Sequence, residues 1–105
     1  MSKLREITAA DFDVEVLRSP VPVAVDFFSH ECGPCRVLKP VLESLAEGIG
    51  NRAKIVALNV ADNERLVTAH GISAVPTILV FDQGREVRCM VGLAQVGELR
   101  EALAA

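Results

Sequence analysis

The segment from Val21 to Phe28 constrains the fold of this chain most, because it is an almost uninterrupted run of apolar residues. Such a run is typical of a β-strand that is covered on both faces. Cys32-Gly33-Pro34-Cys35 follows it, and from Pro34 to Ile49 apolar residues recur at helical spacing. The sequence therefore predicts a buried strand that leads through a pair of cysteines into an amphipathic helix.

The helix after the cysteines is expected to bury one face and to bend near its middle. Pro40 removes one backbone hydrogen bond and crowds the preceding turn, which favours a kink. Gly48 and Gly50 are expected to end the helix. The apolar side chains that we expect on its inner face are Leu38, Val41, Leu42, Leu45 and Ile49.

Shorter elements complete the predicted order. Thr8 as N-cap, with Asp11 three residues on, predicts a first helix that ends near Ser19-Pro20 and buries Phe12, Val16 and Leu17. The further predicted elements are a buried strand at Lys54–Val60, a short helix at Asn63–His70 closed by Gly71, strands at Thr77–Phe81 and Glu86–Val91 joined by a tight turn, and a last helix at Gln95–Leu103. This order predicts an α/β fold in which helices cover both faces of a mixed sheet.

Size and composition favour a single domain over residues 1–105. Half of the 105 residues are apolar and the net charge is −3, and no basic run or aromatic platform indicates nucleic-acid binding. No stretch approaches the ~18 apolar residues of a membrane span, and residues 1–12 lack the apolar segment of a secretory signal. Three cysteines, an odd number, speak against a disulfide-rich secreted scaffold, so we expect a cytoplasmic protein.

The two cysteines of the motif are predicted to exchange disulfides. At the start of a helix Cys32 can accept backbone N–H bonds, which favours its thiolate and makes it the expected nucleophile. Cys35 lies one turn later on the same face and can resolve a mixed disulfide, while Gly33 and Pro34 suit the tight turn. The alternatives are half of a metal site and an inert thiol pair; we expect no metal, because such sites usually supply four ligands.

Asp26 lies inside the apolar strand. Burial there is expected to raise the pKa of its carboxyl, so that Asp26 holds a proton near neutral pH and can act as a base. From the residues alone, a buried acid with satisfied hydrogen bonds or a strand-end residue is an equally good interpretation.

The order of these motifs resembles the thioredoxin family over essentially the whole chain. The residues that carry the resemblance are Val25-Asp26-Phe27, Cys32-Gly33-Pro34-Cys35, Pro40, Val75-Pro76-Thr77, Gly84 and Gly92. The resemblance implies a thioredoxin fold, with a central five-stranded mixed β-sheet flanked by four α-helices, and a monomeric enzyme that reduces disulfides in other proteins. It also implies no bound cofactor, because a separate flavoprotein reductase passes electrons from NADPH to the Cys32–Cys35 disulfide.

The resemblance also assigns roles to single residues. It makes Asp26 the base toward Cys35. It implies a cis bond before Pro76, beside the cysteines, which leaves the backbone of Val75 open to an extended substrate. It places Gly92 at the other wall of the same groove, where a substrate backbone can approach closely. Without the family, Gly92 is a simple strand-end glycine.

The sequence departs from the family pattern around the cysteines. Phe28 and Glu31 stand where the family usually has tryptophan, and the chain contains no tryptophan. We hypothesise that the charge of Glu31 disfavours the Cys32 thiolate and so makes the pair a stronger reductant, an effect that a protonated His30 would offset. The alternative is that water screens the exposed charge.

The sequence also leads to expectations for Ala57, Cys89 and His70. Ala57 stands where the family commonly has a lysine near the buried aspartate, so we expect Asp26 to hold its proton more firmly. Cys89 alternates with valines and is predicted to face the core, with a regulatory thiol as the alternative. His70, at a helix end, is expected to complement the helix dipole and not to bind a metal.

Three rival functions remain at the level of the sequence. An oxidant or isomerase would use the same exchange, but Pro34 rather than histidine between the cysteines and the lack of an export signal speak against it. A binding subunit would use the surface around Phe28 and Glu31 without turnover. A holder of a metal or iron–sulfur cluster would need Cys32, Cys35 and a histidine.

Overall fold

Five strands form one mixed sheet in the structure, a computed structural model that describes residues 4–93 and 96–104. The strands are β1 (Arg5–Ile7), β2 (Val23–Phe28), β3 (Lys54–Asn59), β4 (Thr77–Asp82) and β5 (Arg85–Val91). Their order in the sheet is β1-β3-β2-β4-β5. β1 and β2 run parallel to β3, whereas β4 runs antiparallel to β2 and β5. The mixed sheet predicted from the sequence is confirmed.

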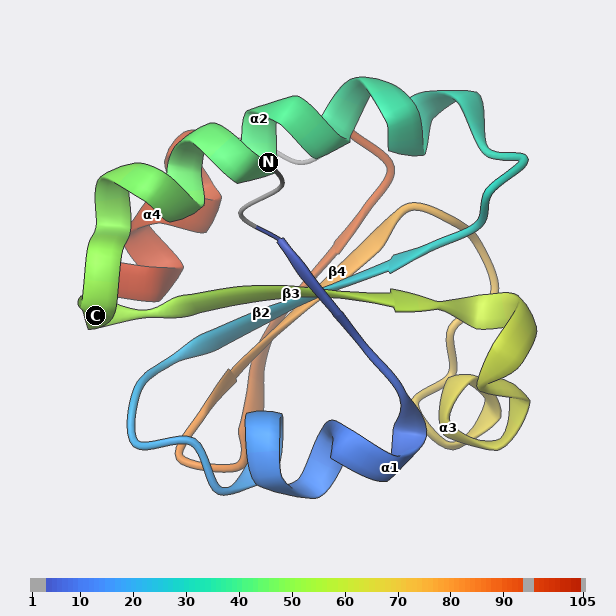
Figure 1. Cartoon of the computed structure of the whole chain (residues 1–105), viewed down its shortest axis with the longest axis horizontal. Coiled ribbons are helices and arrows are strands. Elements are labelled where there is room, and N and C mark those ends of the chain that lie inside the picture. Colours follow the sequence, from blue (N-terminus) through green and yellow to red (C-terminus); the bar gives the residue numbers. More distant parts are fainter. Residues whose placement is uncertain (1–3, 94–95, 105) are drawn as a thin grey trace.

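Helices cover both faces of the sheet, so the molecule has three layers (Figure 1). The helices are α1 (Ala9–Phe12), continued by a π-helical turn at Asp13–Leu17, α2 (Gly33–Ile49), α3 (Glu64–Ala69) and α4 (Val96–Ala104), with short 3-10 turns at Gly50–Arg52 and Val60–Asp62. α2 and α4 lie on one face, and α1 and α3 lie on the other. The predicted start of the last helix at Gln95 lies outside the described residues.

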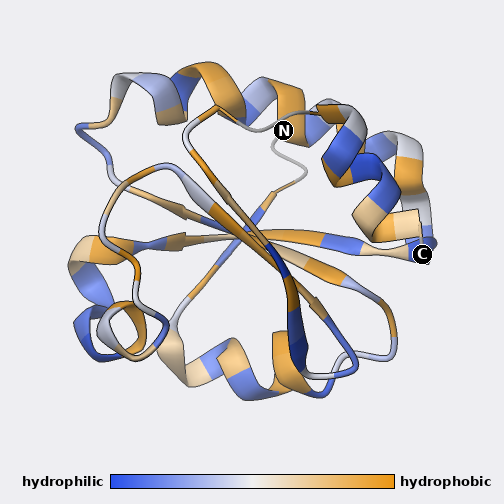
Figure 2. Ribbon diagram, turned by 180° about the vertical axis from the view of Figure 1, so that it is seen from behind, coloured by the Kyte–Doolittle hydropathy of each residue, from blue (hydrophilic) through white to orange (hydrophobic). Residues whose placement is uncertain are grey.

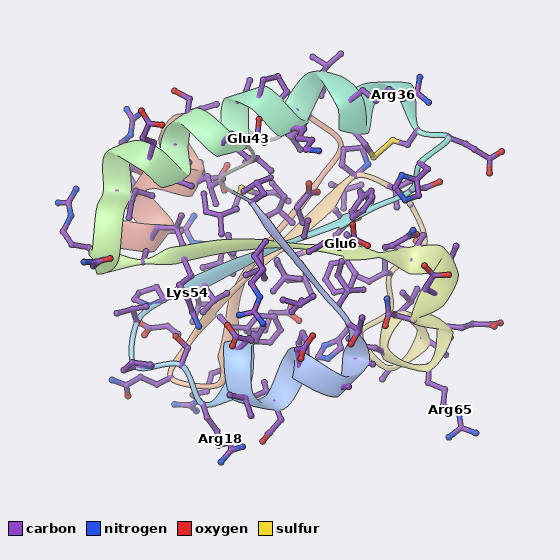
Figure 3. All side chains as sticks on the ribbon, in the orientation of Figure 1. Glu6, Arg18, Arg36, Glu43, Lys54 and Arg65 are labelled. Carbon is purple, nitrogen blue, oxygen red and sulfur yellow. A yellow bond between two sulfur atoms is a disulfide. The ribbon has the colours of Figure 1, made fainter. Side chains whose placement is uncertain are left out.

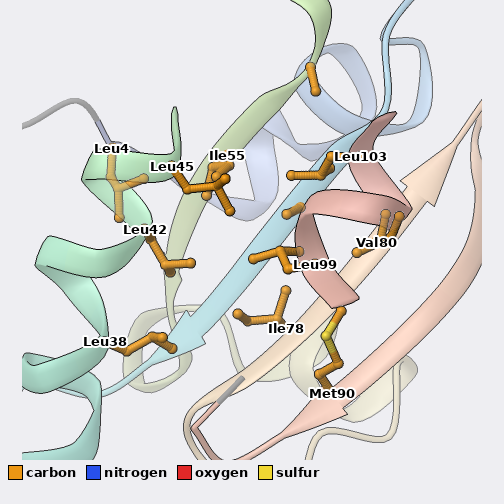
Figure 4. Close-up of a cluster of buried hydrophobic side chains, with 13 residues drawn as sticks. Leu4, Leu38, Leu42, Leu45, Ile55, Ile78, Val80, Met90, Leu99 and Leu103 are labelled. Carbon is orange, nitrogen blue, oxygen red and sulfur yellow. The ribbon is translucent and has the colours of Figure 1, made fainter. Parts of the chain in front are cut away.

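The two faces of the sheet bury separate apolar cores. The α2-side core contains Leu4, Ala24, Leu38, Leu42, Leu45, Ala53, Ile55, Ile78, Val80, Met90, Leu99, Ala102 and Leu103 (Figure 4). The α1-side core contains Ile7, Phe12, Val16, Val23, Val25, Phe27, Val56, Leu58, Leu79 and Phe81. In Figure 2 hydrophobic segments run through the crossing strands, while the helices alternate between hydrophobic and hydrophilic residues. Burial on both sides explains why β2 has a continuous apolar sequence.

Local signals in the sequence explain the ends of several elements. The Thr8 N–H donates to Asp11 Oδ2 at 3.2 Å, as expected for Thr8 as N-cap with an acidic residue three positions on. Gly50, with φ of 66°, ends α2. Gln83 and Gly84 both have positive φ, as a two-residue hairpin turn requires, and a Cβ on Gly84 would lie 2.9 Å from the carbonyl oxygen of Leu17. The hairpin, the start of α1 and the end of α2 at Gly50 are therefore confirmed, whereas Gly48 lies inside α2 and does not end it.

Two predictions of burial are wrong. Cys89 is exposed, because β5 is an edge strand and the face that carries Cys89 is left uncovered. Within β5 only Met90 is buried, on the side of α4. Val41 is 37% exposed, whereas Leu38, Leu42 and Leu45 are buried. The inner face of α2 is therefore narrower than the spacing of its apolar residues indicated.

The first strand was not recognised in the sequence as an element of its own. β1 has three residues, and Ile7 is the one that is buried. Its side-chain pattern is too short for an alternation to stand out. The family resemblance implied the fifth strand, and the pairing of β1 with β3 supplies it.

Candidate functional site

The cysteine pair lies at the start of α2, where the chain leaves β2. Cys32 is the N-cap of α2, with extended backbone angles, and Gly33 and Pro34 form the first turn. A disulfide joins Cys32 to Cys35, whose Cα atoms are 5.2 Å apart (Figure 3). Cys32 is partly exposed, whereas Cys35 is buried. A large partner can therefore reach Cys32 more readily than Cys35.

The helix stabilises negative charge on the outer sulfur. The backbone N–H of Cys35 donates to Cys32 Sγ at 3.1 Å. α2 has 17 residues, and its unpaired N-terminal N–H groups carry the partial positive end of the helix dipole. This arrangement favours the thiolate of a reduced Cys32 over its thiol.

Hydrogen bonds that the sequence analysis did not anticipate hold the loop before Cys32. The N–H of Cys32 donates to the carbonyl of Ser29 at 3.2 Å, and the N–H of Glu31 donates to Ser29 Oγ at 3.2 Å. Arg36 Nη2 donates to the carbonyl oxygen of His30 at 2.9 Å. A serine two residues before a loop N–H is a known turn signal, so Ser29 was accessible from the sequence. Arg36 was not, because its contact runs back across the cysteine pair.

The positions where the family usually has tryptophan are occupied differently. Glu31 is exposed and directly precedes Cys32 in the chain. The ring of Phe28 packs edge-on against the ring of His30, with centroids 5.3 Å apart. The surface before the cysteines therefore carries the ring pair of Phe28 and His30 and the charge of Glu31 in place of two indole side chains.

Asp26 lies under the cysteine pair and is 3% exposed. Its Oδ1 atom has no hydrogen-bond partner among the described residues. Burial raises the pKa of this carboxyl to about 7. The expected burial of Asp26 and the rise of its pKa are confirmed. A carboxyl of this kind can take and return a proton near neutral pH.

A cavity of about 170 Å³ connects Asp26 with Cys35. Its lining residues are Leu4, Glu6, Asp26, Phe28, Ser29, His30, Cys35, Arg36, Lys39 and Ala57. Ala57 pairs with Asp26 across β3 and β2, so its small side chain leaves space on the α2 face of the sheet. Sequence reasoning identified Ala57 as a departure but missed Glu6 and Lys39, which come from β1 and α2.

The structure brings Pro76 and Gly92 together at the same end of the sheet. The Val75–Pro76 bond is cis, as the resemblance implies, and the N–H of Gly92 donates to the carbonyl of Pro76 at 2.8 Å. Thr77 pairs with Phe27 on one side and with Val91 on the other. Pro76, Gly92 and the loop that leaves β2 therefore lie at one end of the sheet.

His70 is the C-cap of α3, as expected from the sequence. Its ring packs against Phe12 and Phe81, with centroids 5.3 and 5.8 Å away. Residues 4–93 and 96–104 contain no cluster of three or more His, Cys, Asp or Glu side chains placed to hold a metal ion. No described helix is both long and apolar enough to span a membrane.

Comparisons with known proteins agree with this geometry. The family model described as Thioredoxin matches residues 3–105. Thioredoxin 1 of Nostoc sp. is 36% identical over 103 residues, which cover 98% of this chain and 96% of that protein. The thioredoxin of Haemophilus influenzae is 38% identical over 92 residues, or 88% of this chain and 86% of that one. The thioredoxin of Rickettsia bellii is 35% identical over 95 residues, 90% of each.

Thioredoxins have no prosthetic group, and their redox-active group is a pair of cysteines, which Cys32 and Cys35 supply here. They are protein disulfide oxidoreductases that work by dithiol–disulfide exchange. With the expected fold, the expected cysteine pair and these relatives, the chain belongs to the thioredoxin family.

Proposed function

We propose that this chain is a single-domain, monomeric cytoplasmic reductase of protein disulfides, and that a separate flavoprotein reductase recharges it with electrons from NADPH. The observation that carries the proposal is the asymmetry of the cysteine pair. Cys32 Sγ accepts the N–H bond of Cys35 at the start of α2 and is partly exposed, while Cys35 is buried behind it. An accessible thiolate can attack a partner, and a buried thiol beside it can end the reaction.

The proposed reaction has two exchange steps. The Cys32 thiolate attacks one sulfur of a substrate disulfide, and the other substrate sulfur leaves as a thiolate that takes up a proton. Cys35 then loses its proton and attacks Cys32 Sγ, so that the bond between Cys32 and the substrate breaks. The substrate gains two electrons and two protons, and the cysteine pair becomes a disulfide.

Asp26 is proposed as the base for the second step. Its carboxyl shares a cavity with Cys35, and burial raises its pKa to about 7. The carboxylate form can therefore accept the proton of Cys35 at neutral pH, and the acid form can release it afterwards. Burial disfavours the charged carboxylate of Asp26, and this favours its uptake of the proton from Cys35.

Val75, Pro76 and Gly92 are proposed to hold the substrate backbone. The ladders that pair β4 with its neighbours begin at Thr77, so Val75 lies beyond the paired part of β4. Gly92, with φ of 86°, has space around its Cα, because a Cβ there would meet no atom within 4 Å. An extended peptide can add to such a short edge through its main chain, which gives affinity with little dependence on side chains.

Reduction of an insulin-type disulfide tests this function, with dithiothreitol or NADPH plus a flavoprotein reductase as electron source. We expect turnover with both sources. Turnover with dithiothreitol alone would contradict the proposed recharging partner but not the exchange chemistry. Turnover with neither, in protein whose Cys32 and Cys35 are shown to be reduced, would favour a binding subunit that uses the same surface.

A further inference from the structure

We propose that Glu6 and Lys39 form the proton exit of Asp26, and that the cavity over Ala57 is the passage between the buried carboxyl and these two side chains. The inference rests on the proposed role of Asp26 as a base. The proton that Asp26 took from Cys35 can return to Cys35 when the disulfide is reduced again, or it can leave to solvent, and either route restores the carboxylate. Asp26 is 3% exposed, so the route to solvent needs a defined path.

The pairing of three strands places Glu6, Ala57 and Asp26 in one row. Glu6 pairs with Ala57 across β1 and β3, and Ala57 pairs with Asp26 across β3 and β2. Paired residues point to the same face of a sheet, and so do residues two positions apart in a strand. The residues two positions earlier are Leu4, Ile55 and Ala24, and all three belong to the α2-side core. The row therefore faces α2, with the small Ala57 between two carboxyl groups.

The space over Ala57 is large enough for a chain of water molecules. A cavity of roughly 10–15 Å³ holds one water, and this one measures about 170 Å³. Glu6, Asp26, Lys39 and Ser29 give it polar walls. A side chain as long as lysine at position 57 would occupy this space from β3. Here the positive charge comes instead from α2, where Lys39 lies one turn after Cys35.

The charged groups of the cavity differ in what else they bind. Arg36 donates to the carbonyl of His30, and the ring of His30 packs on Phe28. Neither Glu6 nor Lys39 forms an ion pair with another described residue, and both residues are exposed. The carboxylate of Glu6 therefore remains available to accept a proton that leaves the cavity, and the charge of Lys39 remains available to stabilise the ionised Asp26.

The proposed step is a proton transfer without any change in covalent bonds of the chain. Protonated Asp26 gives its proton to water in the cavity, and the proton passes to the carboxylate of Glu6 and then to bulk solvent. The positive charge of Lys39 favours the ionised Asp26 that remains, whereas the negative charge of Glu6 disfavours it. Cys35 loses its proton only to Asp26, so the exit acts in the interval between two resolutions.

The test is an NMR titration of the Asp26 carboxyl carbon in reduced protein. We expect Lys39→Gln to raise the pKa of Asp26 and Glu6→Gln to lower it, each by roughly 0.5 to 1 unit, because water screens both side chains. The pH profile of the mixed-disulfide resolution rate should move with each shift. Matched controls are Lys54→Gln, which removes the same charge at the other end of β3, and Glu47→Gln, on the exposed face of α2. If Lys39→Gln and Glu6→Gln titrate like these controls, the inference is overturned.

Ala57→Leu tests the passage itself. A leucine at this position fills part of the cavity, so we expect slower repeated turnover and a smaller effect of Lys39→Gln in the double variant. Turnover at the wild-type rate in folded Ala57→Leu protein would overturn the passage. Should the leucine prevent folding, the exposed charge variants still decide. The titration needs no substrate, so it reports on the exit even if the wild-type chain fails to reduce insulin.

Discussion

The two faces of β2 differ in what packs against them. Val23, Val25 and Phe27 point to α1 and are completely buried among apolar side chains. On the other face Ala24 packs under α2, but Asp26 follows it and lies against a cavity. A buried carboxyl lowers stability, and a cavity gives up packing contacts, so the site is supported by the closely packed face behind it. One strand thus carries close packing on one side and a titratable carboxyl on the other.

The largest effect is expected from replacing Cys35, the proposed resolving cysteine. This change affects the α2 side of the sheet and leaves the α1-side core intact. In Cys35→Ser protein the mixed disulfide of Cys32 has no internal thiol to release it. We expect turnover to fall by on the order of 10³-fold or more, as when a residue that forms a covalent bond is lost. Mass spectrometry should detect the trapped adduct. Cys89→Ser, which changes an exposed thiol on β5, is the control and should keep full turnover.

Asp26→Asn measures how much the buried carboxyl lowers the free energy of unfolding. The carboxyl ionises near pH 7 in the folded chain and at about 3.8 in the unfolded one. The free energy of unfolding of the wild type therefore falls as pH rises from about 4 to about 7, since only the unfolded chain releases its proton readily there. At about 1.4 kcal/mol per pKa unit, the variant should be more stable by about 4 kcal/mol at pH 8.

Urea unfolding at several pH values checks this prediction. The difference between variant and wild type should shrink to a small remainder near pH 3.5, where the carboxyl is protonated in the folded state and mostly protonated in the unfolded state. A difference that stays constant from pH 3.5 to pH 8 would mean that desolvation of the charge is not the cause.

Val25→Ala tests the contribution of the opposite, closely packed face of β2. Its side chain is fully buried on the face away from the cysteines. Loss of two carbons should reduce the free energy of unfolding by about 2 kcal/mol through lost burial and a residual cavity. Insulin reduction below the unfolding transition should be unchanged. A fall in turnover of the folded variant would show that the two faces are not independent.

The sequence predicted those parts of the fold whose signal is local and long. The apolar run of β2, the period of α2 and the two positive-φ positions between β4 and β5 each determine the structure near them. Asp26 belongs with these, because a carboxyl inside a continuous apolar run is desolvated whatever packs on it. The cysteine pair likewise needs only a strand before it and a helix after it.

The rest depended on contacts between distant segments. Cys89 alternates with valines, but alternation gives a face and does not say whether another layer covers that face. Glu6 joins the cavity only because β1 pairs with β3 in one register, and β1 is too short to be recognised. Lys39 looked like an ordinary solvent-facing residue of α2. These residues became part of the site through pairing and through the small size of Ala57, which no local pattern reports.

The smallest effect is expected from Glu31, whose charge lies outside both apolar cores. Glu31 is exposed beside Cys32, so its carboxylate opposes the thiolate across water. Glu31→Gln should lower the pKa of Cys32 by at most about half a unit, because solvent and salt screen the pair. The rate of alkylation of reduced protein as a function of pH measures this value, and Glu47→Gln, also on the surface but far along α2, is the matched control. An unchanged or higher pKa would leave the backbone N–H of Cys35 and the helix dipole as the groups that set the reactivity of Cys32.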